Sequence, residues 1–300
     1  GTGMLLFQTG LPVLTVVGAT AATIAADVRI SLDGQFTFTN ASTQNLVITG
    51  NLTLNDKTAG APGTNFDIGA GRTLTAAGAN VTVGTNCSFT ATTGGLTGIL
   101  LLDVAAPNTL LTFTVPNGSS VANLTVADNV AFAGAILGNT FSVTTAMIHN
   151  GGDINIGTAN LQIGAGAVPY TRTAGTYSGS GFFIWNSTGV FTHGPALALN
   201  NLRVSQALAL VSASGVTVND YLDLNGAVFT QTVGGTARLT IGDANGVTVE
   251  VDGTGNINNA AGQSAPAFGA GATNYLFTNA ASAPNLFTWP TAQANNVTVN

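Results

Sequence analysis

One motif recurs at a constant interval, and this repeat constrains the fold of the chain more than any other feature. Asn45–Ile48, Asn123–Val126 and Asn201–Val204 share the pattern Asn-Leu-x-Val/Ile, with equal spacing (123 − 45 = 78 and 201 − 123 = 78). A fourth copy begins at Asn296, after a longer spacing (296 − 201 = 95). A Phe-Thr pair precedes every copy, beginning at Phe38, Phe113, Phe191 and Phe287. Repeats of this kind are typical of proteins that stack similar units along one axis.

The repeat predicts how the chain is organised. We expect a partial unit over 1–44, units over 45–122, 123–200 and 201–295, and the start of a further unit over 296–300. The unit 201–295 is longer than the other two (95 against 78), which we assign to an insertion near 256–273. Because the last unit stops soon after it begins, we expect the chain to be a segment of a longer array.

Within each unit, apolar residues alternate with Thr, Asn, Ser and Gly. Val81–Val83, Val216–Val218 and Val247–Val249 each read Val-Thr-Val. A period of two is typical of half-buried β-strands. We find no segment with apolar residues at helical spacing, so the sequence predicts an all-β protein.

Strand-opening residues predict the size of one coil. They fall near 45, 65, 80 and 99 in the first complete unit, and near 123, 140, 160 and 182 in the second. Four coils of about 20 residues per unit would form a parallel β-helix, also called a β-solenoid. Recurrent Asn side chains would then stack along the axis. The alternative is a row of tandem β-sandwich domains, but no polar, Pro-rich linker separates the units.

The sparse charge restricts the partners. The 300 residues include six Lys/Arg and twelve Asp/Glu, so charged residues make up 6% and the net charge is −6. An ordinary soluble domain has about 25% charged residues. The six basic residues are scattered, which argues against nucleic acid as a partner. The uncharged stretches 1–26 and 253–300 are interrupted by polar residues, so no membrane span is predicted. This composition favours an extracellular location.

The combination of motifs resembles a known class of proteins. Phe-Thr-x-Pro, Asn-Leu-x-Val, Val-Thr-Val and the Leu-Asp-Leu-Asn of Leu222–Asn225 are similar to repeats of large secreted surface proteins of Bacteroidetes, including gliding adhesins. More loosely, they resemble the β-helical haemagglutinin and autotransporter adhesins of other Gram-negative bacteria. The resemblance implies export, a cell-surface location and a role in adhesion, filaments or motility.

Two acidic pairs are the best candidates for chemistry, namely Asp220 with Asp223 and Glu250 with Asp252. Residues 250 and 252 share one face of a strand, an arrangement that acid/base catalysis or metal binding can use. No basic partner lies nearby in the sequence apart from Arg238, and we therefore interpret all four as residues of a solvated outer face. No catalytic, cofactor-binding or metal-binding residue is predicted.

The remaining reactive side chains are expected to be structural. His149 and His193 are far apart in the sequence, and no triad or metal-ligand spacing links them. Cys87 is the single cysteine, and we expect it to be a small buried residue.

The sequence thus predicts a non-enzymatic structural or adhesive segment of a cell-surface fibre, without a cofactor. Its expected partners are further copies or coils stacked end to end, and surface glycans. The alternative is a β-helix protein that binds or degrades polysaccharides. The first needs no cluster of charged side chains, whereas a degrading enzyme needs convergent carboxylates in a groove.

Overall fold

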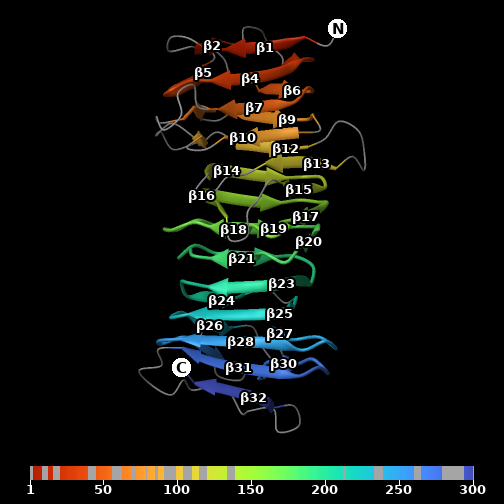
Figure 1. Ribbon diagram of the computed structural model, residues 1–300, viewed down its shortest axis with the longest axis vertical. Helices are drawn as coiled ribbons and strands as arrows, with labels where there is room; N and C mark the ends of the chain where they lie inside the picture. Colours follow the sequence, from red (N-terminus) through yellow and green to blue (C-terminus); the bar gives the residue numbers. More distant parts are fainter. Residues whose placement is uncertain are drawn as a thin grey trace.

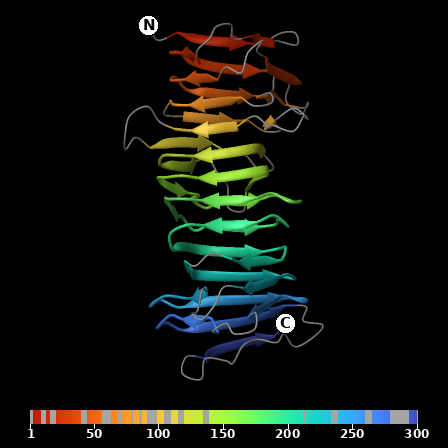
Figure 2. The ribbon, with the colours of Figure 1, turned by 180° about the vertical axis from the view of Figure 1, so that it is seen from behind.

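The chain forms a column of stacked coils, and each coil contributes short strands to three faces (Figures 1 and 2). The computed structural model describes residues 3–8, 13–15, 21–39, 45–55, 63–68, 72–78, 80–84, 87–90, 99–103, 110–114, 120–133, 139–211, 214–232, 239–259, 265–278 and 294–299. The strand pairings within these ranges are parallel along the whole column. This confirms the parallel β-helix, since a β-sandwich is built from antiparallel strands.

The three faces follow one another in a fixed order along the chain, and we call them faces 1, 2 and 3. Face 1 holds β2 (Val13–Thr15), β5 (Gln35–Thr39), β8 (Asn65–Asp67), β11 (Ser88–Thr90), β18 (Asn160–Ile163), β21 (Phe182–Trp185), β28 (Val247–Asp252), β31 (Thr273–Thr278) and β32 (Ala294–Val299). Face 2 holds β3 (Ala22–Ile24), β6 (Leu46–Ile48), β9 (Thr73–Ala76), β12 (Ile99–Leu102), β19 (Tyr170–Arg172), β22 (Phe191–His193), β24 (Leu208–Leu210), β26 (Val228–Gln231) and β29 (Asn256–Asn259).

Face 3 holds β1 (Met4–Phe7), β4 (Asp27–Ser31), β7 (Leu52–Asn55), β10 (Asn80–Val83), β13 (Leu111–Thr114), β15 (Val130–Ala133), β17 (Asp153–Asn155), β20 (Thr176–Ser178), β27 (Leu239–Ile241) and β30 (Ala267–Phe268). Four longer strands bend across a corner. β14 (Ser120–Val126) and β16 (Thr140–His149) run from face 1 to face 2, whereas β23 (Leu197–Val204) and β25 (Val216–Asn225) run from face 3 to face 1.

Alternating side chains build the core, as the period of two predicts. In β7, Leu52 and Leu54 are buried and Thr53 between them is half-buried. In-register residues of neighbouring coils therefore meet inside the column. The rings of Phe36 and Phe66 are 5.0 Å apart, and those of Phe66 and Phe89 are 5.8 Å apart. Cys87 belongs to this core with 1% of its surface exposed, as predicted.

The repeated motif does not stay on one face of the column. Leu46 and Leu124 lie on face 2, and the path Leu46–Leu74–Leu100–Leu124 takes three coils, not the four expected for this unit. Leu202 pairs with Phe183 on face 1. The predicted strand starts at 65, 80 and 99 are correct, but they fall on faces 1, 3 and 2. Because one coil carries three strands, counting strand starts overestimated the number of coils.

Three of the motif's asparagines join neighbouring coils. The Asn45 side chain accepts a hydrogen bond from the Thr73 backbone N–H at 2.9 Å, one coil further on. Asn201 Nδ2 donates to the Ser180 carbonyl at 2.7 Å, and Asn296 Nδ2 donates to Asn274 Oδ1 at 3.1 Å. The predicted Asn stacking therefore occurs as local pairs and as bonds to the adjacent backbone.

Candidate functional site

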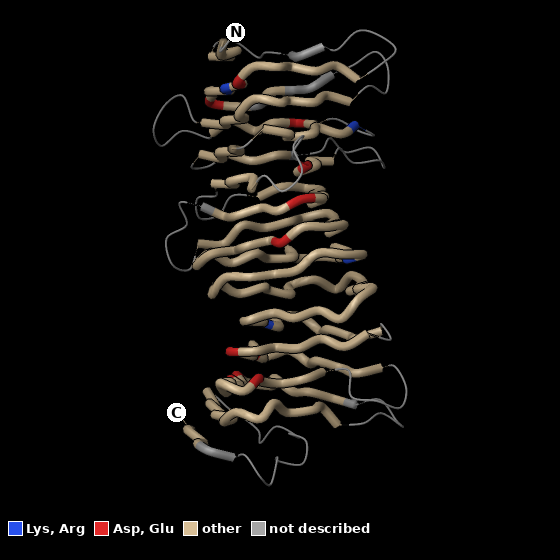
Figure 3. The backbone as a smooth tube through the Cα atoms, turned by 90° about the vertical axis from the view of Figure 1, so that its right-hand side faces the viewer, with Lys and Arg blue, Asp and Glu red and all other residues tan. Residues whose placement is uncertain are grey.

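Among the described residues, outward polar and aromatic side chains gather on face 1, across β21, β23, β25 and β28. The register aligns Arg203 with Asp223 and Asp223 with Glu250. Since alternate residues of a strand point to the same side, all three side chains lie in one outward row along the column axis. Figure 3 shows that charged residues are scattered thinly along the column, so this concentration stands out.

An ion pair lies at the centre of the row. Arg203 Nε donates to Asp223 Oδ2 at 2.6 Å, and the side chains are 37% and 6% exposed, respectively. The Arg203 guanidinium also lies 4.9 Å from the centre of the Phe182 ring, which is a cation–π distance. The guanidinium is thus held between a ring and a carboxylate.

Aromatic and hydroxyl groups complete the cluster. The rings of Phe182 and Tyr221 meet edge-to-face at 5.6 Å, although their strands are two coils apart. Tyr221 Oη donates to Glu250 Oε2 at 2.7 Å. Thr278 Oγ1 donates to the other oxygen, Glu250 Oε1, at 3.2 Å. Both oxygens of Glu250 are therefore oriented by neighbouring coils.

Electrostatics at the cluster follow from partial burial among acids. Burial raises the pKa of the Asp223 carboxyl; Arg203 opposes this shift, and Glu250 and Asp252 add to it. Burial also raises the pKa of Tyr221, with a further contribution from Glu250. Tyr221 consequently stays a neutral hydrogen-bond donor, and Asp223 protonates more easily than an ordinary aspartate.

The structure corrects the interpretation of the predicted acids. Asp223, Glu250 and Asp252 do lie on an outer face, but Asp223 is buried to 4% exposure and has a basic partner. Asp220 is exposed, at the bend of β25. Arg238 lies outside the described residues. Sequence reasoning missed Arg203 because it lies one full coil before Asp223 and is therefore distant in the sequence.

A second polar group lies inside the column, on face 2. The register stacks His149 on Arg172 and Arg172 on His193 in three consecutive coils. All three are buried, with 0%, 4% and 1% exposure. The preceding coils place Ile48, Ala76, Leu102 and Val126 at the equivalent inward position. The histidines are thus two coils apart, which their spacing in the sequence did not reveal.

Backbone carbonyls satisfy the buried arginine. Arg172 Nε donates to the Gly175 carbonyl at 3.0 Å, and Nη1 donates to the carbonyls of Pro195 and Ala196 at 3.1 and 3.3 Å. Gly175 adopts φ +87°, and a Cβ there would lie 2.2 Å from His149 Nε2. A glycine is therefore required at the corner that supplies this acceptor.

The histidines are held in the neutral form. His149 Nε2 lies 3.3 Å from the Gly152 carbonyl, and His193 Nδ1 lies 3.1 Å from the Pro195 carbonyl. Burial, with a smaller contribution from the nearby Arg172, lowers the pKa of His149 to about 4, although the hydrogen bond to the Gly152 carbonyl opposes this shift. Burial likewise lowers the pKa of His193. This closed arrangement suits core packing and offers no access for a substrate; the structural role expected for both histidines stays a prediction.

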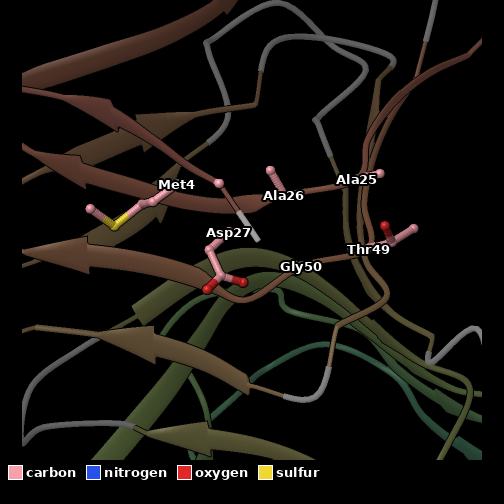
Figure 4. Close-up of a pocket in the computed structure, with 7 residues that line it drawn as sticks. Met4, Ala25, Ala26, Asp27, Thr49 and Gly50 are labelled. Atoms are coloured by element: carbon pink, nitrogen blue, oxygen red, sulfur yellow. The ribbon is translucent and has the colours of Figure 1, made fainter. Parts of the chain in front are cut away.

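A small cavity of about 250 Å³ lies at a corner near the first coils, lined by Gly3, Met4, Ala25, Ala26, Asp27, Thr49 and Gly50 (Figure 4). Asp27 is the charged residue of this lining. Its Oδ1 already accepts a hydrogen bond from the Asn51 N–H at 2.8 Å. The cavity therefore lies at a corner between stacked coils, and the carboxylate of Asp27 already forms a hydrogen bond within the fold.

Comparison with known proteins finds no matching family model, no matching curated protein and no matching solved structure. Within the described ranges, no three His, Cys, Asp or Glu residues are grouped so that they could hold a metal ion. In the same part of the chain, no helix is long and apolar enough to cross a bilayer.

Proposed function

We propose that this chain is a non-catalytic structural and adhesive segment of an extracellular fibre on a cell surface. The observation that supports this most is the column of parallel coils around one apolar core. In such a column each coil packs on the coil before it and the coil after it. A rod of this kind spans distance and presents long outer faces, which are the properties that a surface fibre needs.

The outward chemistry supports the extracellular location. Outward positions of consecutive coils carry hydroxyl and amide groups, as in the row Thr53, Thr82 and Thr114 on face 3. With only 6% charged residues, hydration depends on these neutral groups. The resemblance to secreted surface proteins of Bacteroidetes points the same way and stays a prediction.

Exposed apolar strands support assembly along the axis. Met4, Leu5 and Leu6 of β1 are 56%, 39% and 41% exposed, and Val297 and Val299 of β32 are 54% and 72% exposed. Apolar strand edges favour pairing with other strands. As part of the proposal, further coils of the same chain or of a second copy cover these strands.

Antibody labelling of the native cells tests the proposal. An antibody raised against the purified chain should label intact, unpermeabilised cells, and electron microscopy should show thin fibres under the label. Labelling that appears only after permeabilisation would contradict the surface location. Antibody against a cytoplasmic protein provides the control for cell integrity.

A polysaccharide-degrading enzyme is the second candidate, because Asp223 and Glu250 are carboxylates on neighbouring coils and the pKa of Asp223 is raised. Glycoside hydrolysis uses such a pair. However, Arg203 binds Asp223, and Tyr221 and Thr278 bind Glu250, so both acids are engaged in the fold. Incubation with a panel of polysaccharides should therefore release no products; product release that Glu250→Gln abolishes would favour the enzyme.

A further inference from the structure

We infer that the outward cluster on face 1 is a binding site for a neutral polysaccharide chain that runs along the column axis. We call it the outer platform and define it by Phe182, Arg203, Tyr221, Asp223 and Glu250. The inference rests on the proposed adhesive function, because it names the ligand class through which this segment would adhere.

The outer platform combines the two chemistries that a sugar ring requires. A pyranose has faces of C–H bonds, which pack on aromatic rings, and an edge of hydroxyl groups, which need fixed hydrogen-bonding partners. Phe182 and Tyr221 supply half-buried rings in contact with each other. Arg203, 37% exposed in its side chain, supplies guanidinium donors beside them.

The polar groups of the outer platform are held in place before any ligand arrives. Asp223 fixes Arg203 through the 2.6 Å ion pair, and Phe182 packs against the same guanidinium. Tyr221 and Thr278 fix the two oxygens of Glu250. Because these side chains are already ordered, less side-chain entropy is lost when a ligand binds.

Charge selects the ligand class. Arg203 contributes +1, and Asp223, Glu250 and Asp252 contribute −3, so this part of face 1 carries −2. Uronate, sulfated and nucleic-acid chains would be repelled, since binding them depends on clustered Lys and Arg. A neutral chain of pyranose rings keeps the ring and hydroxyl contacts without this repulsion.

The register of the strands determines how the bound polysaccharide would be oriented. Phe182 and Tyr221 share their outward row with the amides and hydroxyl of Asn201, Thr248 and Asn274, so each successive coil presents one of these groups. The strands that carry them are spaced by about 4.8 Å. A polysaccharide along the axis would therefore meet a ring or a hydrogen-bonding group at each coil, whereas a chain lying across the axis would leave the face at the corners.

Binding measurements on the purified chain test the inference. The probes are hexasaccharides of β-linked glucose, mannose, xylose and N-acetylglucosamine, with a galacturonate hexamer as the acidic probe. At least one neutral probe should bind, and Tyr221→Ala should weaken that binding by about tenfold or more, as expected for a central aromatic contact. Arg203→Ala should also weaken it. Thr192→Ala, at an exposed outward position of face 2, is the matched control and should leave the affinity unchanged.

Footprinting of the unaltered chain covers the case in which a variant does not fold. Hydroxyl-radical oxidation of Phe182 and Tyr221 should fall when the bound hexasaccharide is present, and that of Phe191 in the core should not change. The inference would be overturned if no neutral hexasaccharide bound, or if the galacturonate hexamer bound more tightly than the neutral probes. It would also be overturned if Tyr221→Ala left the affinity unchanged and the ligand did not protect Tyr221 from oxidation. Surface labelling of cells together with any of these results would leave the proposed function standing without this site.

Discussion

Two stretches of face 2 fill the same inward position of the coil with residues of different chemistry. From β6 to β14, one inward position is filled by Ile48, Ala76, Leu102 and Val126 in successive coils. From β16 to β22, the same position is filled by His149, Arg172 and His193. Both stretches are buried. The first is stable because apolar surface leaves water, and in the second the Arg172 guanidinium donates hydrogen bonds to backbone carbonyls.

The corners explain the difference. In the polar stretch, the carbonyls of Gly175, Pro195 and Ala196 accept hydrogen bonds from Arg172. Gly175 can supply its carbonyl because it adopts φ +87°, a conformation open to glycine. Leu102, which has no polar atom in its side chain, needs no such acceptor. A buried cation is therefore tolerated in this fold where the neighbouring corner supplies acceptors.

Moving the cation to the apolar stretch should have the largest effect. Leu102→Arg would bury a charge between Ala76 and Val126, whose side chains offer no polar partner, and it should lower the free energy of unfolding by more than about 5 kcal/mol. Urea denaturation followed by circular dichroism measures this. The matched control is Leu101→Arg, at the neighbouring outward position, which should change stability little. Equal stability of the two variants would show that an inward charge at this position needs no hydrogen-bond acceptor.

Removing the cation should have the next largest effect. Arg172→Ala leaves the carbonyls of Gly175, Pro195 and Ala196 without their donor, and we expect a loss of about 3–5 kcal/mol. Val126→Ala, at the same inward position two coils earlier, removes only apolar contacts and should cost about 2 kcal/mol. Urea denaturation of the two variants, measured side by side, gives both losses. A smaller loss for Arg172→Ala than for Val126→Ala would show that the corner carbonyls do not stabilise the buried cation.

Acid should weaken the polar stretch selectively. The pKa of His149 is about 4 in the folded chain against about 6.5 when unfolded, so the unfolded chain binds more protons between these values. Stability therefore falls as the pH drops from about 6.5 towards 4, by about 3 kcal/mol from His149. His193 adds in the same direction.

His149→Leu isolates this contribution, because it resembles the apolar filling found in earlier coils. The leucine does not titrate, so the unfolding free energy of the original chain should rise relative to that of the variant, by about 2 kcal/mol, when the pH is raised from 4.5 to 7. Urea denaturation of both chains at the two pH values measures the change. A relative stability that is independent of pH would show that His149 is not held neutral by burial.

The Arg203–Asp223 ion pair should have the smallest effect. Asp223 is buried, but the Arg203 side chain is 37% exposed, so solvent screens the pair. Arg203→Gln keeps an amide donor beside Asp223 and should cost about 1 kcal/mol. Thermal unfolding should shift by only a few degrees. A loss as large as that of Arg172→Ala would mean that the outer platform, and not the buried stack, holds these coils together.

The sequence predicted the fold class because strand periodicity is a local property. Val-Thr-Val triplets and the strand starts at Asn65 and Asn80 report the alternation directly. Register is not local, because coils vary in length. The in-register step from Leu46 to Leu74 is longer than the step from Leu202 to Leu222.

These variable lengths hid the long-range contacts. The number of coils per unit, the Arg203–Asp223 pair and the stack of His149, Arg172 and His193 all depend on where each coil closes. The spacing of the residues in the sequence therefore did not reveal them. The burial of Cys87 was predictable from its residue type, whereas the sequence predicted a structural role for both histidines without predicting their burial.

The register of the strands decides which residues share a face, and disulfide trapping measures it directly. Thr171 and Thr192 point outward from β19 and β22 and are paired in register, although they belong to successive coils. Cα atoms of such neighbours lie within the range that a disulfide spans, about 4.4–6.8 Å. In a Cys87→Ala background, Thr171→Cys with Thr192→Cys should cross-link readily under mild oxidation. Gln162→Cys, nearer to Thr171 in sequence but on face 1, should not cross-link with Thr171→Cys. Faster cross-linking of the Gln162 pair would contradict the stacked three-faced column.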